Sequence, residues 1–160
     1  MRDSMRWMLC CAALGLAAVG CGGTEGPADG GGSDADVVTC QNDPRVDSFA
    51  ANLTKKSAGG TYQIVLMSAD PAPPAIGVNT WTIKAIDGAG NPMANPDLKV
   101  LPFMPDHGHG TSVKAAVTAQ PDGTLSVTPL YLFMGGVWRV EFNPQSGSAD
   151  PADFFFCIAG

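Results

Sequence analysis

The sequence predicts an all-β domain, an antiparallel β-sandwich of about seven strands. The 160 residues include 20 Gly and 13 Pro, which favour turns over helix interiors. Beyond Gly60, short runs rich in β-branched and aromatic side chains are separated by Gly, Pro, Asn and Asp. These runs cover residues 61–67, 79–86, 97–103, 112–119, 124–133, 136–142 and 153–159.

Alternation within two of the runs indicates strands with one buried face. Over residues 81–85, Trp, Ile and Ala alternate with Thr and Lys, and residues 138–142 alternate in the same way. The segments 87–91 and 121–123 contain Asp, Asn and Gly, which tolerate positive φ and therefore fit the turns between strands. The strands before and after these turns are expected to build the core.

One short helix is predicted ahead of the strands, over residues 43–53. Asp43 is a suitable cap and Pro44 suits the first turn. The apolar residues with helical spacing i, i+3, i+4 and i+7 are Val46, Phe49, Ala50 and Leu53.

Residues 1–20 have the pattern of a signal peptide. Arg2 and Arg6 precede an apolar run, residues 7–19, that is too short to span a bilayer. The run ends in Ala-Val-Gly before Cys21, which resembles the lipobox of bacterial lipoproteins, so Cys21 is the expected lipid attachment residue. The alternative is an ordinary signal peptide with an accidental Cys. Gly22 in place of Asp fits sorting to the outer membrane, facing the periplasm or the cell surface.

A flexible tether is expected over residues 21–36, before a folded domain at residues 37–160. The tether is rich in Gly and Asp and lacks bulky apolar side chains. Removal of residues 1–20 takes away two Arg and one Asp and changes the net charge from −6 to −7. Nucleic acid is therefore not an expected partner, and attachment to the membrane would depend on the lipid.

Two cysteines remain after export and acylation. Cys10 and Cys11 leave with the signal and Cys21 carries lipid, so Cys40 and Cys157 remain in an oxidising compartment. We expect a disulfide between them. The alternative is that two thiolates bind a metal ion.

Both histidines of the chain, His107 and His109, lie in one glycine-rich segment, residues 104–110. In an extended segment the two imidazoles project to the same side, and the thioether of Met104 adds a soft ligand that favours copper. Asp106 is a further oxygen ligand or a residue that orients a His ring. The alternative is a polar turn that binds nothing.

The order of the strands places further residues near this segment. If successive strands are antiparallel, the loops 68–78, 104–111 and 134–136 lie at one end of the sandwich. Met134 is then near Met104, whereas Met93 lies at the opposite end. Met67 shares the first end but continues an apolar strand, so a core role is expected for it. The predicted metal site is Met104, His107 and His109 with Met134 nearby.

No enzyme signature is present, and we expect no catalytic residues. A nucleophilic Ser or Cys needs a base, but both His lie in the Met-containing loop. The chain has no Gly-x-Ser-x-Gly elbow and only two Glu, Glu25 and Glu141.

Six segments together resemble the YtkA-like (FixH-related) domain family over about residues 61–142. The resemblance implies an immunoglobulin-like β-sandwich in an exported protein linked to copper handling or cytochrome oxidase assembly. Met104 and His109 match the family's Met-Pro-x-Met-x-His loop, and Met134 matches its later Met-Gly. His107 stands where a second Met is usual, which shifts the preference toward Cu(II). The six segments are residues 74–77, 79–83, 87–92, 104–109, 122–123 and 134–138.

Two hypotheses for function follow from the sequence. The first is an envelope lipoprotein that binds copper through the Met/His loop or delivers it to a copper-receiving envelope protein. The second is a non-enzymatic interaction or structural module of the envelope without metal.

Overall fold

Nine β-strands make up the part of the chain that the computed structural model describes, residues 40–145 and 147–160. The seven runs expected from the sequence all contain a strand. Two short strands, β1 and β5, were not predicted. The strands are β1 (Leu53–Lys56), β2 (Tyr62–Asp70), β3 (Gly77–Asp87), β4 (Leu98–Met104), β5 (His109–Gly110), β6 (Ala116–Ala119), β7 (Leu125–Leu132), β8 (Gly136–Pro144) and β9 (Ala152–Ile158).

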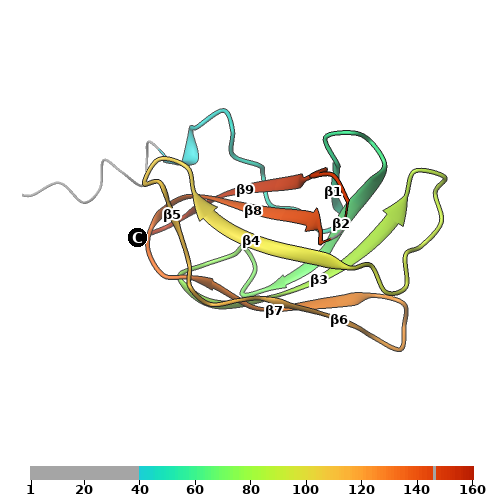
Figure 1. The fold of residues 1–160 in the computed structure, drawn as a ribbon. Coiled ribbons are helices and arrows are strands. Elements are labelled where there is room, and N and C mark those ends of the chain that lie inside the picture. The colour runs from blue at the N-terminus through green and yellow to red at the C-terminus, as the bar shows by residue number, and fades with distance from the viewer. Residues whose placement is uncertain (1–39, 146) are drawn as a thin grey trace, which may run out of the picture. The chain divides into compact units, whose positions relative to one another are not determined.

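The strands form two antiparallel sheets, seen as two layers in Figure 1. One sheet has the order β1-β2-β3-β7-β6 and the other the order β5-β4-β8-β9. In the order across each sheet, β2, β3, β7 and β6 correspond to strands A, B, E and D of an immunoglobulin sandwich, and β4, β8 and β9 correspond to C, F and G. The predicted immunoglobulin-like sandwich is therefore confirmed, with β1 and β5 added at one edge of each sheet.

Aromatic side chains from both sheets meet in the core. Trp81 of β3 is fully buried, and its ring centroid lies 5.9 Å from that of Phe154 and 5.5 Å from that of Phe156, both on β9. Trp138 and Phe142 of β8 are also fully buried. Because burial of each large apolar side chain contributes about 1.5–3 kcal/mol, these rings join the two sheets firmly.

The helix predicted over residues 43–53 does not form there. Within the described chain only Cys40 and Gln41 have helical conformation, and the residues up to β1 form turns and irregular chain. The reason is a long-range pairing: the backbone N–H of Asp47 donates to the carbonyl of Phe155 at 2.8 Å, and the Asp47 carboxylate accepts from the Phe155 N–H at 2.9 Å. The segment is thereby aligned with β9.

A disulfide joins Cys40 to Cys157, with Cα atoms 5.4 Å apart and a sequence separation of 117 residues. The predicted pairing is confirmed. Because both sulfur atoms are in the disulfide, neither is a thiolate that could bind a metal ion. The bond fixes the start of the described chain to β9.

The predicted signal peptide (1–20), the tether (21–36) and the lipid attachment residue Cys21 lie outside the described residues. No helix among residues 40–145 and 147–160 has the length and apolar character needed to cross a membrane.

Candidate functional site

Three loops share the end of the sandwich at which the predicted metal residues lie. Gly77 and Leu132 are opposite each other in the β3–β7 pair, so the loops 71–76 and 133–135 are adjacent. Gly136, at the start of β8, lies beside Met104 at the end of β4. The loop arrangement expected from antiparallel strands is therefore found.

The turn between β4 and β5 reverses the chain over four residues. The backbone N–H groups of His107 and Gly108 both donate to the carbonyl of Met104, at 3.2 and 2.9 Å. Gly108 has φ +70°, a conformation that a side chain disfavours. His109 is then paired with Met104 across the β4–β5 ladder.

Met104 and His107 face the same point beside Gly136. Met104 is fully buried. A Cβ added to Gly136 would lie 2.7 Å from Met104 Cε and 3.9 Å from His107 Nε2. Gly136 has φ +127°, so both its backbone conformation and its surroundings favour glycine. The absence of a side chain at residue 136 brings a thioether and an imidazole to a common space.

The two His rings lie close together at this end. Their centroids are 5.6 Å apart with an interplanar angle of 78°. His109 is half-buried and stacks on Phe133 at 5.5 Å and 22°, whereas His107 is exposed. Phe133 contacts Trp138 edge-on at 5.5 Å, so an aromatic contact to the core supports the His109 ring.

The remaining methionines differ in position. Met134 follows Phe133 and packs against the core, and its carbonyl accepts a hydrogen bond of 2.9 Å from Trp138 Nε1. Its loop neighbour Phe133 stacks on His109, so Met134 belongs to the loop that contacts His109. Met67 lies at a bulge within β2, between residues that pair with Ile83 and Thr82 in the middle of β3. Met93 donates its N–H to the Ala85 carbonyl at the opposite end of the sheet.

Arg45 is a residue of this end that sequence reasoning missed. Its two terminal nitrogens donate to the two carboxylate oxygens of Asp106, each at 2.8 Å. The guanidinium also donates to Asp43 at 2.9 and 2.6 Å. Asp106 is therefore held by Arg45, rather than by a His ring, in this structure. The partners are 61 residues apart in the chain, and no local pattern marks the pair.

These hydrogen bonds lower the carboxyl pKa values around Arg45. The side-chain hydrogen bond from Arg45 is the main cause for both acids: it lowers the pKa of Asp106 below its usual value and that of Asp43 to about 2. Asp106 is exposed and Asp43 is partly buried, so solvent screens the charge of Asp106 more strongly than that of Asp43. Near neutral pH both carboxylates are ionised and available to the guanidinium.

The donor set for a metal is limited to imidazole and thioether. Among residues 40–145 and 147–160, no group of three or more His, Cys, Asp or Glu side chains is placed to hold a metal ion. The candidate site thus depends on Met104, His107 and His109, with Met134 in the adjoining loop. Such a set suits a soft or borderline ion and does not suit magnesium or calcium.

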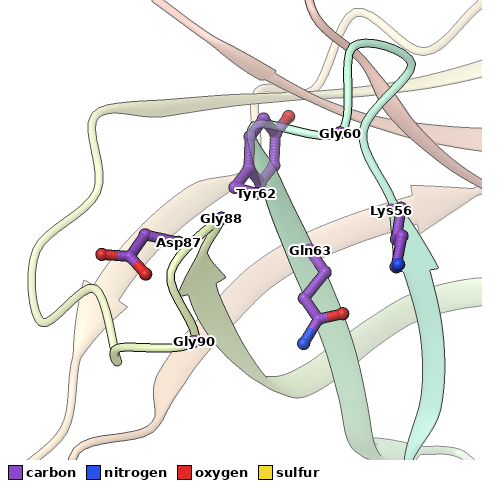
Figure 2. Close-up of a pocket in the computed structure, with 7 residues that line it drawn as sticks. All are labelled: Lys56, Gly60, Tyr62, Gln63, Asp87, Gly88 and Gly90. Carbon is purple, nitrogen blue, oxygen red and sulfur yellow. The ribbon is translucent and has the colours of Figure 1, made fainter.

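A shallow polar pocket lies at the other end of the sandwich (Figure 2). The Asp87 carboxylate on its wall accepts the N–H groups of Ala89 and Asn91 at 2.9 and 2.8 Å, and those bonds lower its pKa. The Asp87 carboxylate therefore binds backbone groups of its own turn. The lining residues are Lys56, Gly60, Tyr62, Gln63, Asp87, Gly88 and Gly90, which include neither His nor Met.

Comparison with known proteins gives one match. A family model described as YtkA-like matches residues 56–143. No curated protein and no solved structure matches the chain. The matched region extends from the last residue of β1 into β8. It contains Met104, His107, His109 and Met134, the four residues that define what we call the Met/His end, but not Arg45. Cys40 and Cys157 lie outside it.

Proposed function

The chain belongs to the YtkA-like family, and from that premise we propose that it binds copper through Met104, His107 and His109, with Met134 beside them. The observation that carries the proposal is the common approach of Met104 Cε and His107 Nε2 to Gly136. The nearby His109 ring supplies a second imidazole. Together these side chains provide one sulfur donor and two nitrogen donors.

The chemistry of this donor set supports copper over other ions. Thioether sulfur favours Cu(I), and imidazole also suits Cu(II). Copper would be cargo rather than a resident cofactor. The exposed position of His107 favours exchange with a second protein, and the proposed partner is a copper-receiving protein of the cell envelope. Lipid attachment at Cys21 would hold the domain at the outer membrane.

The first test is a copper titration of the purified protein at several pH values. Imidazole must lose its proton to bind a metal, so we expect copper affinity to fall as the solution is made more acidic. His107→Ala/His109→Ala should weaken binding by at least about tenfold, since changes to outer-shell partners alone often cost that much. Equal affinity of the double variant and the natural protein would refute the proposal.

Two methionines provide a matched comparison within the same titration. Met104→Leu conserves volume in the core but removes the thioether, so it should weaken Cu(I) binding. Met93→Leu makes the same chemical change at the opposite end and should leave binding unchanged. Equal effects of the two substitutions would contradict a role for the Met104 sulfur.

A metal-free interaction module is the second candidate function. Three exposed apolar side chains favour it: Ile76, Val78 and Phe133 are 47%, 59% and 40% exposed. Two of them lie in the loops 71–76 and 133–135, and Val78 lies at the start of β3. Failure of the natural protein to bind copper at any pH would leave this function in place of the first.

A further inference from the structure

The segment of residues 40–47, named here the N-terminal strap, is fixed to β9 at both ends. Cys40 is bonded to Cys157. Asp47 exchanges two hydrogen bonds with the backbone of Phe155, one from its N–H and one to its carboxylate. Arg45 lies between these two attachments, on a short segment of chain with limited freedom.

Asp43 orients the Arg45 side chain within the strap. One Asp43 oxygen accepts both the backbone N–H and the Nε of Arg45, each at 2.9 Å, and the other accepts a terminal nitrogen at 2.6 Å. Because the guanidinium is planar and rigid, this arrangement directs its remaining donors outward. Those donors bind both oxygens of Asp106, in the paired geometry that gives directional specificity.

Asp106 lies inside the turn that presents the imidazole of His107. The turn begins at buried Met104, and the N–H groups of His107 and Gly108 return to the Met104 carbonyl. Asp106 is the residue of this turn that binds the strap, through its two hydrogen bonds from Arg45. An exposed ion pair contributes little to global stability, so the effect of the contact should be local, on the position of the turn.

We propose that Arg45 is a positioning residue for the copper site, because its hold on Asp106 fixes the turn that carries His107. The inference rests on the proposed copper function. Arg45 does not touch the ion in this scheme. It acts through Asp106, and the Cys40–Cys157 disulfide retains the strap that carries it.

The test combines hydrogen exchange of the metal-free protein with copper titration of the full chain. Arg45→Ala should speed exchange at the His107 and Gly108 amides. It should also weaken copper binding by about tenfold, the scale of outer-shell effects on metal affinity. Arg45→Lys keeps the charge but cannot bind two carboxylates as a rigid fork, so it should restore only part of the loss. The midpoint of thermal unfolding should hardly change.

Several controls separate positioning from general loss of charge or structure. The Gly90 amide donates to Asp87 in a turn at the opposite end of the sandwich and should exchange at an unchanged rate. Lys99→Ala removes an exposed positive charge from that opposite end and should leave copper affinity unchanged. Asp106→Asn should reproduce the effect of Arg45→Ala, and the double variant should lose no more than either single one.

The outcomes distinguish the two proposals. If the natural protein fails to bind copper, the proposed function fails, and the positioning role falls with it. If the natural protein binds copper and Arg45→Ala leaves either the loop exchange or the affinity unchanged, the role of Arg45 is overturned while the copper function stands. Cys40→Ser/Cys157→Ser should shift loop exchange in the same direction as Arg45→Ala, and no shift would remove the disulfide from the scheme.

Discussion

Gly136 lies where Met104 and His107 approach each other, and its role follows from space and backbone conformation. With φ +127° it has a conformation that L side chains rarely adopt. A side chain there would also meet Met104 Cε at 2.7 Å. A small residue thus keeps open the space in which the sulfur and nitrogen donors would meet.

A second residue, Tyr62, makes a polar link between the two sheets. It is 5% exposed, and its hydroxyl lies 2.8 Å from the carbonyl oxygens of both Phe142 and Asp150. Desolvation of the phenol is the main cause that raises the pKa of Tyr62 to about 12. The neutral hydroxyl is therefore the form that the fold stabilises.

Tyr62→Phe tests this link through the pH dependence of stability. The substitution should lower the free energy of unfolding by about 1–3 kcal/mol at neutral pH, because the carbonyls of Phe142 and Asp150 lose the one hydroxyl donor that they share. The contribution of Tyr62 is fully present below its ordinary pKa of 10 and is lost as the pH rises through about 12. Denaturant unfolding of the natural protein should therefore show a steeper decline above pH 10 than unfolding of the variant. Parallel curves would contradict the pKa assignment.

At the scale of elements, short β-rich runs between turn residues predicted seven of the nine strands in the described part of the chain but could not predict the others. β1 has only four residues and β5 only two, too few for a periodic pattern. Residues 43–53 do have helical spacing of apolar side chains. Pairing of Asp47 with β9 overrides that spacing, and the competing partner is more than a hundred residues away in the sequence.

For the candidate site, too, the sequence predicted the features that depend on local pattern and strand order, and it missed those that depend on long-range contacts. Antiparallel connection of successive strands was enough to bring Met104, His107 and His109 to one end with Met134. The stacking of Phe133 on His109 and the hold of Arg45 on Asp106 both depend on side-chain positions in separate loops. The spacing of residues within one segment cannot predict contacts of this kind.

At the scale of the whole molecule, the Cys40–Cys157 disulfide closes nearly the entire described chain. In the ideal chain-entropy model, a loop of this length raises stability by roughly 4–5 kcal/mol through the unfolded state, and measured gains are often smaller. The bond joins the strap to β9 and so stabilises the fold and the Met/His end together.

Peptide mapping with a thiol reagent tests this bond. The peptides that contain Cys40 and Cys157 should remain unlabelled in the unfolded protein, purified without reductant, until a reductant is added. Cys40→Ser/Cys157→Ser should lower the unfolding free energy by about 2–5 kcal/mol. Labelling of either peptide before reduction would show free thiols and remove the bridge.

The central claim is that one thioether and two imidazoles bind a single copper ion at the Met/His end. The most direct measurement is copper X-ray absorption of the protein loaded with Cu(I), which distinguishes sulfur from nitrogen and oxygen ligands. Coordination by Met104, His107 and His109 predicts a sulfur shell together with imidazole nitrogen, and loss of that sulfur shell in Met104→Leu. A spectrum with nitrogen and oxygen ligands alone, or a sulfur shell that persists in Met104→Leu, would contradict it.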